Sequence, residues 1–153
     1  MNEGYLNALA WVFGHPFSMA IFGCCVGSFM NVVYYRYPLG KSVVHPGSSC
    51  PQCHNSIAFY DNIPVLAWFF LRGKCRHCGL TISRQYPLVE FLYGLLFFIC
   101  GWLLPSLHSR YGVAILLFST GSILFFMVRI RRAPWYLWIL LVTSIGLLTL
   151  DFF

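Results

Sequence analysis

The sequence has few charged residues, and acidic residues are the scarcest of them. Only 9% of the 153 residues are charged, with four Asp and Glu against ten Lys and Arg, which gives a formal net charge of +6 at pH 7. A soluble domain carries about a quarter charged residues, and a disordered chain is poor in apolar ones. Here 59% of the residues are hydrophobic. The composition therefore excludes both classes and indicates an integral membrane protein.

Four apolar stretches are long enough, or nearly so, to cross a bilayer core, which needs about 20 helical residues. They cover residues 17–35, 88–104, 111–128 and 134–150. The predicted fold is an all-α polytopic membrane protein with about four transmembrane helices. Residues 1–16 precede these stretches, and we expect them to form an N-terminal segment that lies at the membrane interface.

Positive charge is distributed unevenly among the loops that join these stretches. Nine of the ten basic residues fall between the first and second stretches or between the third and fourth. Because cytoplasmic loops collect Lys and Arg, we predict that both of these loops are cytoplasmic and that both termini lie outside. The first loop, residues 36–86, contains a short apolar run at 63–71. We interpret this run as a re-entrant or interfacial segment.

Four of the seven cysteines form two Cys-x-x-Cys pairs in the first loop. Cys50 and Cys53 form the first pair, and Cys75 and Cys78 form the second. An isoleucine follows each pair at the same offset, Ile57 after the first and Ile82 after the second, so the pairs form a weak internal repeat. Four thiolates in this pattern are typical of a closed, tetrahedral, structural zinc site, and the loop is expected to resemble two zinc knuckles.

Three alternatives to zinc stay open for these cysteines: two disulfides, redox chemistry, or a site that has lost its metal. Disulfides rarely persist in the cytoplasm, so zinc is the favoured interpretation. Because a four-thiolate site has no open position, we expect the ion to organise the loop rather than to take part in a reaction.

Several segments together resemble a known family in their order and spacing. They are GSFMNVV at 27–33, RYP at 36–38, CPQC at 50–53, YDNIP at 60–64, RGKCRHCG at 72–79, IS at 82–83 and YPLVE at 86–90. These segments closely resemble the N-terminal part of the type IV prepilin leader peptidase and N-methyltransferase family. The resemblance assigns residues 17–104 to an N-terminal-type domain and residues 105–153 to two further transmembrane helices in a degenerate peptidase region.

The resemblance implies two activities. Members of the family cleave the basic leader of a prepilin on the cytoplasmic side of the bacterial inner membrane, then methylate the new N-terminal amine with S-adenosylmethionine. They serve type IV pilus or type II secretion systems, so the expected partners are prepilins or pseudopilins and membrane lipid. Cleavage uses two aspartates, one of them in a GxGD motif. One carboxylate activates water, and the other, protonated, polarises the peptide carbonyl.

The sequence departs from the family pattern at these aspartates. The family spacing places the first aspartate at Met127, and the neighbouring position, which is often acidic, is Arg129. No GxGD motif occurs, and Asp151, the one later acid, is predicted on the opposite side of the membrane. We therefore expect no independent peptidase activity, and a separate peptidase-domain protein is a candidate partner.

Five further residues are candidates for the site. Glu90 either forms an anchoring ion pair with Arg36 or Arg84, or takes part in methyl transfer by orienting or deprotonating the substrate amine. Asn31 is a polar residue within the first predicted span, where it serves either a structural hydrogen bond or a substrate or cofactor contact. Three more candidates for substrate or cofactor contact lie in the matching segments: Arg36, Asp61 and Asn62.

Two classes of function stay open. The first is an enzyme, either a prepilin N-methyltransferase or one subunit of a split processing system. The second is a non-catalytic membrane zinc module that binds prepilins or assembly components. No motif supports nucleic-acid binding, and the excess of basic residues is explained by topology and anionic lipid.

Overall fold

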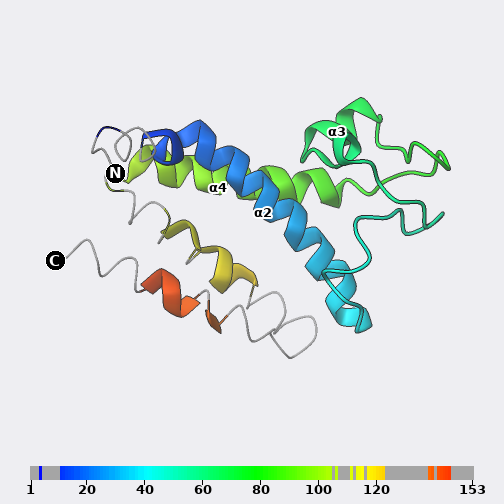
Figure 1. Ribbon diagram of the computed structural model, residues 1–153. Coiled ribbons are helices and arrows are strands. Elements are labelled where there is room, and N and C mark those ends of the chain that lie inside the picture. The colour runs from blue at the N-terminus through cyan, green and yellow to red at the C-terminus, as the bar shows by residue number, and fades with distance from the viewer. Residues whose placement is uncertain are drawn as a thin grey trace. The chain divides into compact units, whose positions relative to one another are not determined.

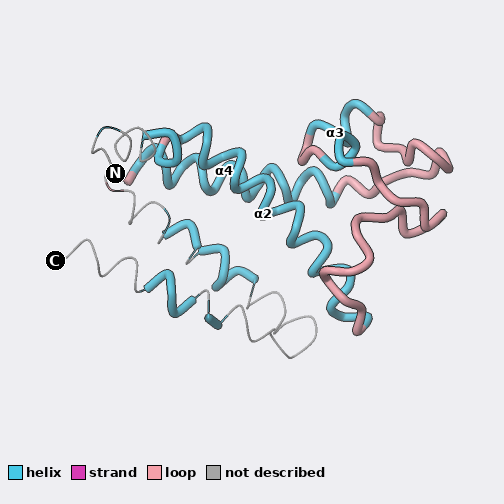
Figure 2. The backbone as a smooth tube through the Cα atoms, in the orientation of Figure 1, coloured by secondary structure: helices cyan, strands magenta, loops and turns pink. Residues whose placement is uncertain are grey.

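The described part of the chain is mostly helical. In the computed structural model, the described residues are 4, 11–104, 106, 111, 113–115, 117–122, 138, 139 and 141–145. Within these ranges no strand forms, as Figure 2 shows. The elements in chain order are α2 (Pro16–Arg36), η1 (Tyr37–Leu39), η2 (Phe59–Asn62), α3 (Leu66–Phe70) and α4 (Gln85–Leu103), as labelled in part in Figure 1. The helical fold class is therefore confirmed.

Two of the helices are long and apolar enough to cross a membrane. They are α2, extended by η1 to Pro16–Leu39, and α4, with 24 and 19 residues respectively. At a rise of 1.5 Å per residue, the 19 residues of α4 alone extend about 28 Å, close to the thickness of a bilayer core. These helices correspond to the first two predicted spans. The third and fourth predicted spans and the N-terminal interfacial segment fall partly outside the described residues.

The end of the first span is set by a glycine. Gly40 has a φ of +63°, and its N–H donates to the carbonyl of Tyr37 at 3.1 Å, while the N–H of Lys41 donates to the carbonyl of Arg36 at 3.1 Å. This pair of bonds satisfies two terminal carbonyls and requires a left-handed residue, which glycine adopts without steric cost. The chain therefore turns out of the helix directly into the cysteine-containing loop.

The chain divides into two compact units, and both long helices contribute to each of them. One unit takes residues 1–22 and 95–153, and the other takes residues 23–94. The described part of the first unit packs around a small buried cluster: Met19, Phe97, Cys100 and Ala114. The second unit contains all of the predicted site residues.

Within the second unit, the two helices approach each other closely at Gly27. A Cβ atom on this residue would lie 2.8 Å from the Cα of Glu90, so the backbones meet without an intervening side chain. Asn31 Nδ2 donates to the carbonyl of Tyr86 at 3.0 Å, and the hydroxyls of Tyr34 and Tyr93 lie 2.9 Å apart. The hydrogen bond of Asn31 agrees with the structural one of its two interpretations, and its contact with substrate or cofactor stays a prediction.

The Gly27 contact generates a prediction. Gly27→Ala should lower the stability of the folded protein by roughly 1–3 kcal/mol, because the new methyl group meets helix backbone that can yield only if the helices separate. The measurement is thermal unfolding of the purified protein in detergent.

Gly121→Ala is the matched control, since this glycine is also helical and a Cβ there meets no atom of the described residues within 4 Å. Alanine favours a helix over glycine, so the control should be neutral or slightly stabilising. Equal effects of the two substitutions would contradict the close approach at Gly27.

Candidate metal centre and adjoining cavity

The two Cys-x-x-Cys segments fold as two copies of one turn. In the first copy, the N–H of Cys50 donates to the carbonyl of Asn55 at 3.0 Å, and the N–H of His54 donates to the carbonyl of Cys50 at 2.9 Å. Both bonds recur in the second copy, from Cys75 to Leu80 at 2.8 Å and from Gly79 to Cys75 at 2.9 Å. The weak sequence repeat is therefore a repeat of backbone structure.

The flanks of the two turns repeat as well. Each turn is closed by one isolated antiparallel bridge, Ser49 with Ser56 and Lys74 with Thr81. The residue after each second cysteine is left-handed, with a φ of +59° at His54 and +70° at Gly79. Histidine is one of the few side chains enriched in that region. The backbone conformation therefore accounts for the residue type at both positions.

The paired turns bring the four cysteine sulfur atoms together. The Sγ atoms of Cys50, Cys53, Cys75 and Cys78 all lie within 4.8 Å of one another. A tetrahedral zinc ion with Zn–S bonds of about 2.3 Å requires sulfur atoms about 3.8 Å apart. The Sγ atoms of Cys50 and Cys78 are separated by 3.9 Å, far beyond the length of a disulfide. The donor set and its spacing fit zinc.

The thiols of this cluster have different pKa values, partly because backbone N–H groups donate hydrogen bonds to some of the sulfur atoms. The N–H groups of Cys78 and His77 donate to the sulfur of Cys75 and lower the pKa of that thiol to about 6. The N–H of Leu80 favours the Cys78 thiolate, but desolvation and the sulfur atoms of the other three cysteines outweigh it and raise the pKa of Cys78 to about 11. A bound cation would favour all four thiolates.

An ion pair attaches η2 to the second turn. Arg76 donates from Nε and Nη2 to the two carboxylate oxygens of Asp61, both at 2.6 Å, and its guanidinium lies 5.6 Å from the ring centre of Tyr60. The Asp61 side chain is 9% exposed. The hydrogen bonds from Arg76 hold the pKa of Asp61 below its ordinary value. Asp61, a candidate for substrate contact, thus has a structural partner.

Trp68 covers the second turn, and no sequence motif indicated it. Its Nε1 donates to the carbonyl of Ile82 at 3.1 Å, and a Cβ on Gly73 would lie 2.7 Å from its ring. Gly73 also has a φ of +67°, so both space and backbone conformation require glycine there. The sequence feature that comes closest to indicating this contact is Gly73 itself, which lies between Arg72 and Lys74.

Glu90 is buried, with 8% of its surface exposed, and it is held by neutral donors. The N–H of Val65 donates to Oε2 at 2.6 Å, and the Ser28 hydroxyl also hydrogen-bonds the carboxylate. The ion pair with Arg36 or Arg84, one of the two interpretations of Glu90, is not formed. The ion pair found in the described ranges joins Arg76 to Asp61.

Arg36 is used instead to shape the start of the loop. Its guanidinium donates to the carbonyls of Ser42, Pro46 and Gly47 at 3.2, 2.7 and 2.9 Å. One cation therefore satisfies three carbonyls of a segment that forms no regular structure. This clamp occupies Nη1 and Nη2, the groups that would otherwise bind an anionic ligand.

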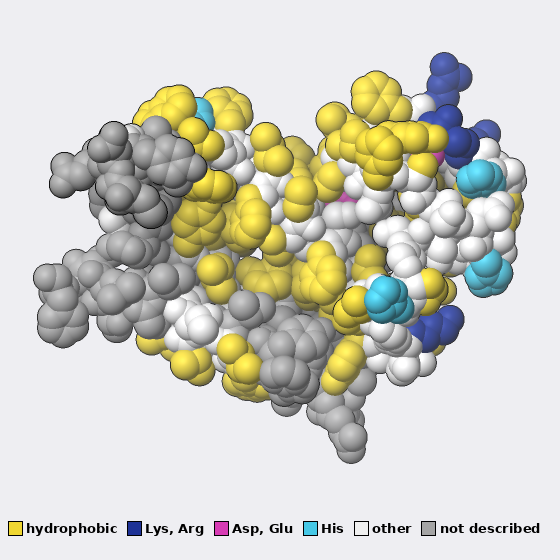
Figure 3. Space-filling model, viewed as in Figure 1, with side chains coloured by type: hydrophobic (Ala, Val, Ile, Leu, Met, Phe, Trp, Pro, Cys, Tyr) yellow, Lys and Arg dark blue, Asp and Glu magenta, His cyan; other side chains and the backbone are white. Residues whose placement is uncertain are grey.

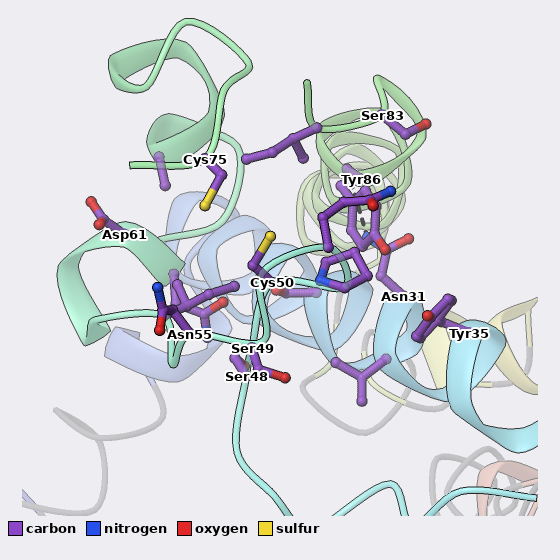
Figure 4. Close-up of a pocket in the computed structure, with 18 of the residues that line it drawn as sticks. Asn31, Tyr35, Ser48, Ser49, Cys50, Asn55, Asp61, Cys75, Ser83 and Tyr86 are labelled. Atoms are coloured by element: carbon purple, nitrogen blue, oxygen red, sulfur yellow. Dashed lines mark hydrogen bonds between the residues drawn. The ribbon is translucent and has the colours of Figure 1, made fainter. Parts of the chain in front are cut away.

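A cavity of about 770 Å³ lies between the helices and the loop of the second unit. Its size is within the range of small-molecule sites. Figure 4 shows Asn31, Tyr35 and Tyr86 on one side and Cys50, Cys75 and Asp61 on the other. Arg36, Asn62 and Glu90 also line it. The cavity therefore gathers most of the predicted site residues, and it adds His45, Tyr35, Tyr86 and Trp68, which the sequence analysis did not single out.

Comparison with known proteins identifies relatives over this unit. The profile of the bacterial peptidase A24 N-terminal domain matches residues 21–104. A prepilin leader peptidase/N-methyltransferase of Myxococcus xanthus is 51% identical over 110 residues, covering 66% of this chain and 33% of the relative. A protein of the same name from Klebsiella pneumoniae is 45% identical over 101 residues, covering 62% and 44%.

A third relative has a related name. The type 4 prepilin-like proteins leader peptide-processing enzyme of Escherichia coli is 36% identical over 126 residues, covering 71% of this chain and 46% of the relative. The chain thus spans between a third and a half of the length of these relatives. No solved structure is significantly similar to the chain.

The sulfur cluster generates a prediction about metal content. The full chain purified in detergent should contain one zinc ion per molecule, and Cys75→Ser should lose it, because three thiolates and a hydroxyl bind zinc less strongly. The measurement is elemental analysis together with native mass spectrometry.

Cys25→Ser is the control, since Cys25 lies in α2 and outside the sulfur cluster. It should keep the ion. A protein without bound zinc, or equal zinc in both variants, would contradict the metal centre.

Proposed function

The chain belongs to the family of the bacterial peptidase A24 N-terminal domain, and from that premise we propose that it takes part in prepilin processing at the membrane. The names of its relatives support this assignment, since each refers to prepilins or their leader peptides. Two long apolar helices support a membrane location. In this proposal, the protein is a multi-pass protein of the bacterial inner membrane, with the tetracysteine loop in the cytoplasm and both termini outside.

The proposed contribution of the chain is methylation of the prepilin N-terminal amine. The observation that carries this proposal is the buried Glu90 carboxylate in the wall of the cavity. An α-amino group has a pKa of about 7.7–8.0, so much of it is protonated near neutral pH and must lose a proton before it can attack a methyl group. A fixed carboxylate can orient the ammonium and accept that proton.

The cavity also has the properties of a site for the methyl donor. S-adenosylmethionine, when bound, supplies an electrophilic methyl group on a cationic sulfur. The rings of Tyr35 and Tyr86 line the cavity, and aromatic faces attract cations. Glu90 would accept the proton that the substrate ammonium gives up before its nitrogen takes this methyl group. Zinc, held by the four cysteines, stabilises the loop wall.

Peptide cleavage is not part of this proposal. The two acids in the described ranges, Asp61 and Glu90, each have hydrogen-bond partners within the fold. Met127 and Arg129 occupy the expected acidic positions and, like Asp151, lie outside the described residues. We propose that a separate peptidase-domain protein supplies the aspartates, in a pilus or a type II secretion system.

A second candidate is a non-catalytic zinc module that binds prepilins or assembly components. One observation favours it: the Glu90 carboxylate already binds the backbone of Val65, so its role could be to hold the loop. The two candidates differ in what they require of residue 90. A structural role needs a hydrogen-bond acceptor, whereas methyl transfer needs a negative charge.

This difference generates a prediction. The full chain in lipid vesicles, given S-adenosylmethionine and a pre-cleaved prepilin, should add one methyl group to the N-terminus, as read by mass spectrometry. Glu90→Gln should lower the rate by about a hundredfold or more, the usual effect of losing a general base. The amide oxygen can still accept the Val65 N–H, so zinc content and thermal stability should stay near those of the parent protein.

Tyr93→Phe is the control, because it alters a polar contact of the same helix pair and does not line the cavity. It should retain methylation. Intact prepilin, given in parallel, should remain uncleaved unless a peptidase-domain partner is added. Undiminished methylation by Glu90→Gln would exclude the proton-accepting role. No methylation by the parent protein, with prepilin still bound, would favour the non-catalytic module.

A further inference from the structure

The segment before α3 contains a strained turn. Val65 has φ +63° and ψ −55°, and the N–H of Leu66 donates to the carbonyl of Pro64 at 2.6 Å, which makes Val65 the centre of a γ-turn of the rarer kind. A β-branched residue rarely adopts a positive φ. The surroundings must therefore hold it, and the bond from the Val65 N–H to Glu90 does so.

The turn lies beside the interior of the two long helices rather than beyond their ends. Its partner Glu90 is five residues into α4, and Ser28, which also binds Glu90, is eight residues before the end of α2. At 1.5 Å per residue, these positions are about 8 Å and about 12 Å inside the helix ends. Pro64 also lines a hollow together with Cys25 and Phe29 of α2. The turn therefore lies alongside the two helices and not beyond their loop-side ends.

The side chains around this turn that point outward are large and apolar. Phe59 is 86% exposed, Phe70 81% and Phe69 63%, and Leu66 is exposed as well, whereas Ala67 is buried. Figure 3 shows this apolar surface over α3, with the Lys and Arg side chains close by. Arg72 and Lys74, directly after α3, are both exposed. We name Phe59, Leu66, Phe69 and Phe70 the α3 apolar face.

We propose that residues 59–71 form a re-entrant segment that enters the leaflet on the side of the tetracysteine loop, with the α3 apolar face in contact with lipid acyl chains. Non-helical backbone is tolerated at membrane depth only where its polar groups are satisfied within the protein. Here Glu90 satisfies the Val65 N–H, and Pro64 satisfies that of Leu66. Glu90 is thus a positioning residue for the re-entrant turn.

Charge favours anionic lipid as the occupant of this face. Arg72 and Lys74 flank it, and of the two acids nearby, Asp61 is paired with Arg76 and Glu90 is buried. Such a surface attracts the anionic phosphates of lipid headgroups. Aromatic side chains next to basic ones are also the composition found at membrane interfaces.

The test uses the full chain in vesicles of phosphatidylethanolamine and phosphatidylglycerol. Phe70 is replaced by the photo-crosslinker p-benzoylphenylalanine, and mass spectrometry counts the lipid adducts after illumination. The control places the same crosslinker at Gln52, an exposed residue of the first cysteine turn. Position 70 should give roughly tenfold more lipid adducts than position 52, because a residue outside the bilayer does not meet acyl chains. Equal yields, or adducts confined to a second chain or to added prepilin, would overturn the proposal.

A second arm tests the positioning role of Glu90. Glu90→Leu removes the acceptor for the Val65 N–H and should lower the yield of lipid adducts at position 70, whereas Glu90→Gln should retain it. If Glu90→Leu does not fold, as shown by lost zinc, the comparison of positions 70 and 52 in the parent background still decides the proposal. Full retention in a folded Glu90→Leu protein would refute the positioning role. Methylation is not measured, so either result is independent of the proposed activity.

Discussion

The hydrogen bond between the Val65 N–H and Glu90 determines where the loop meets the helices. At 2.6 Å it joins a turn of the loop to the interior of α4, and it satisfies two groups that are costly to bury alone. A buried donor or acceptor without a partner costs about 1–3 kcal/mol, and a charged one costs more. The close approach at Gly27 brings α2 against Glu90 from the other side. These two contacts together position the cavity wall at Glu90.

The metal centre supplies a second, independent constraint. The loop between the two long helices has few buried apolar side chains and little core of its own, and small units of this kind depend on metals or disulfides. The four sulfur atoms join two turns that are distant in the sequence, while the Arg76–Asp61 pair and Trp68 tie the second turn to η2 and α3. Thiolates therefore fix the two cysteine turns, and the Glu90 carboxylate fixes the segment between them.

The features that the sequence predicted are those with a local pattern. An apolar run of about 20 residues indicates a span, and Cys-x-x-Cys spacing indicates a metal site, whatever surrounds them. No sequence pattern indicated the hydrogen-bond donor that binds Glu90. Basic residues nearby suggested an ion pair, but the donor is a backbone N–H, which every residue except proline carries. The positive φ of Val65 could not be predicted either, because β-branched residues rarely adopt such a conformation. The three carbonyl partners of Arg36 had no sequence pattern either, whereas its expected contact with substrate or cofactor stays a prediction.

The structural role of Glu90 and the chemical role proposed for it are compatible in one side chain. An ionised carboxylate offers about four acceptor positions on two oxygens, and Val65 and Ser28 use two of them. Acceptor capacity remains for an amine in the cavity, and the two bonds fix the orientation of the group. A glutamine would hold the turn equally well, and burying an amide costs much less than burying a charge. Packing alone therefore gives no reason for a carboxylate here, whereas accepting a proton from a bound amine requires one.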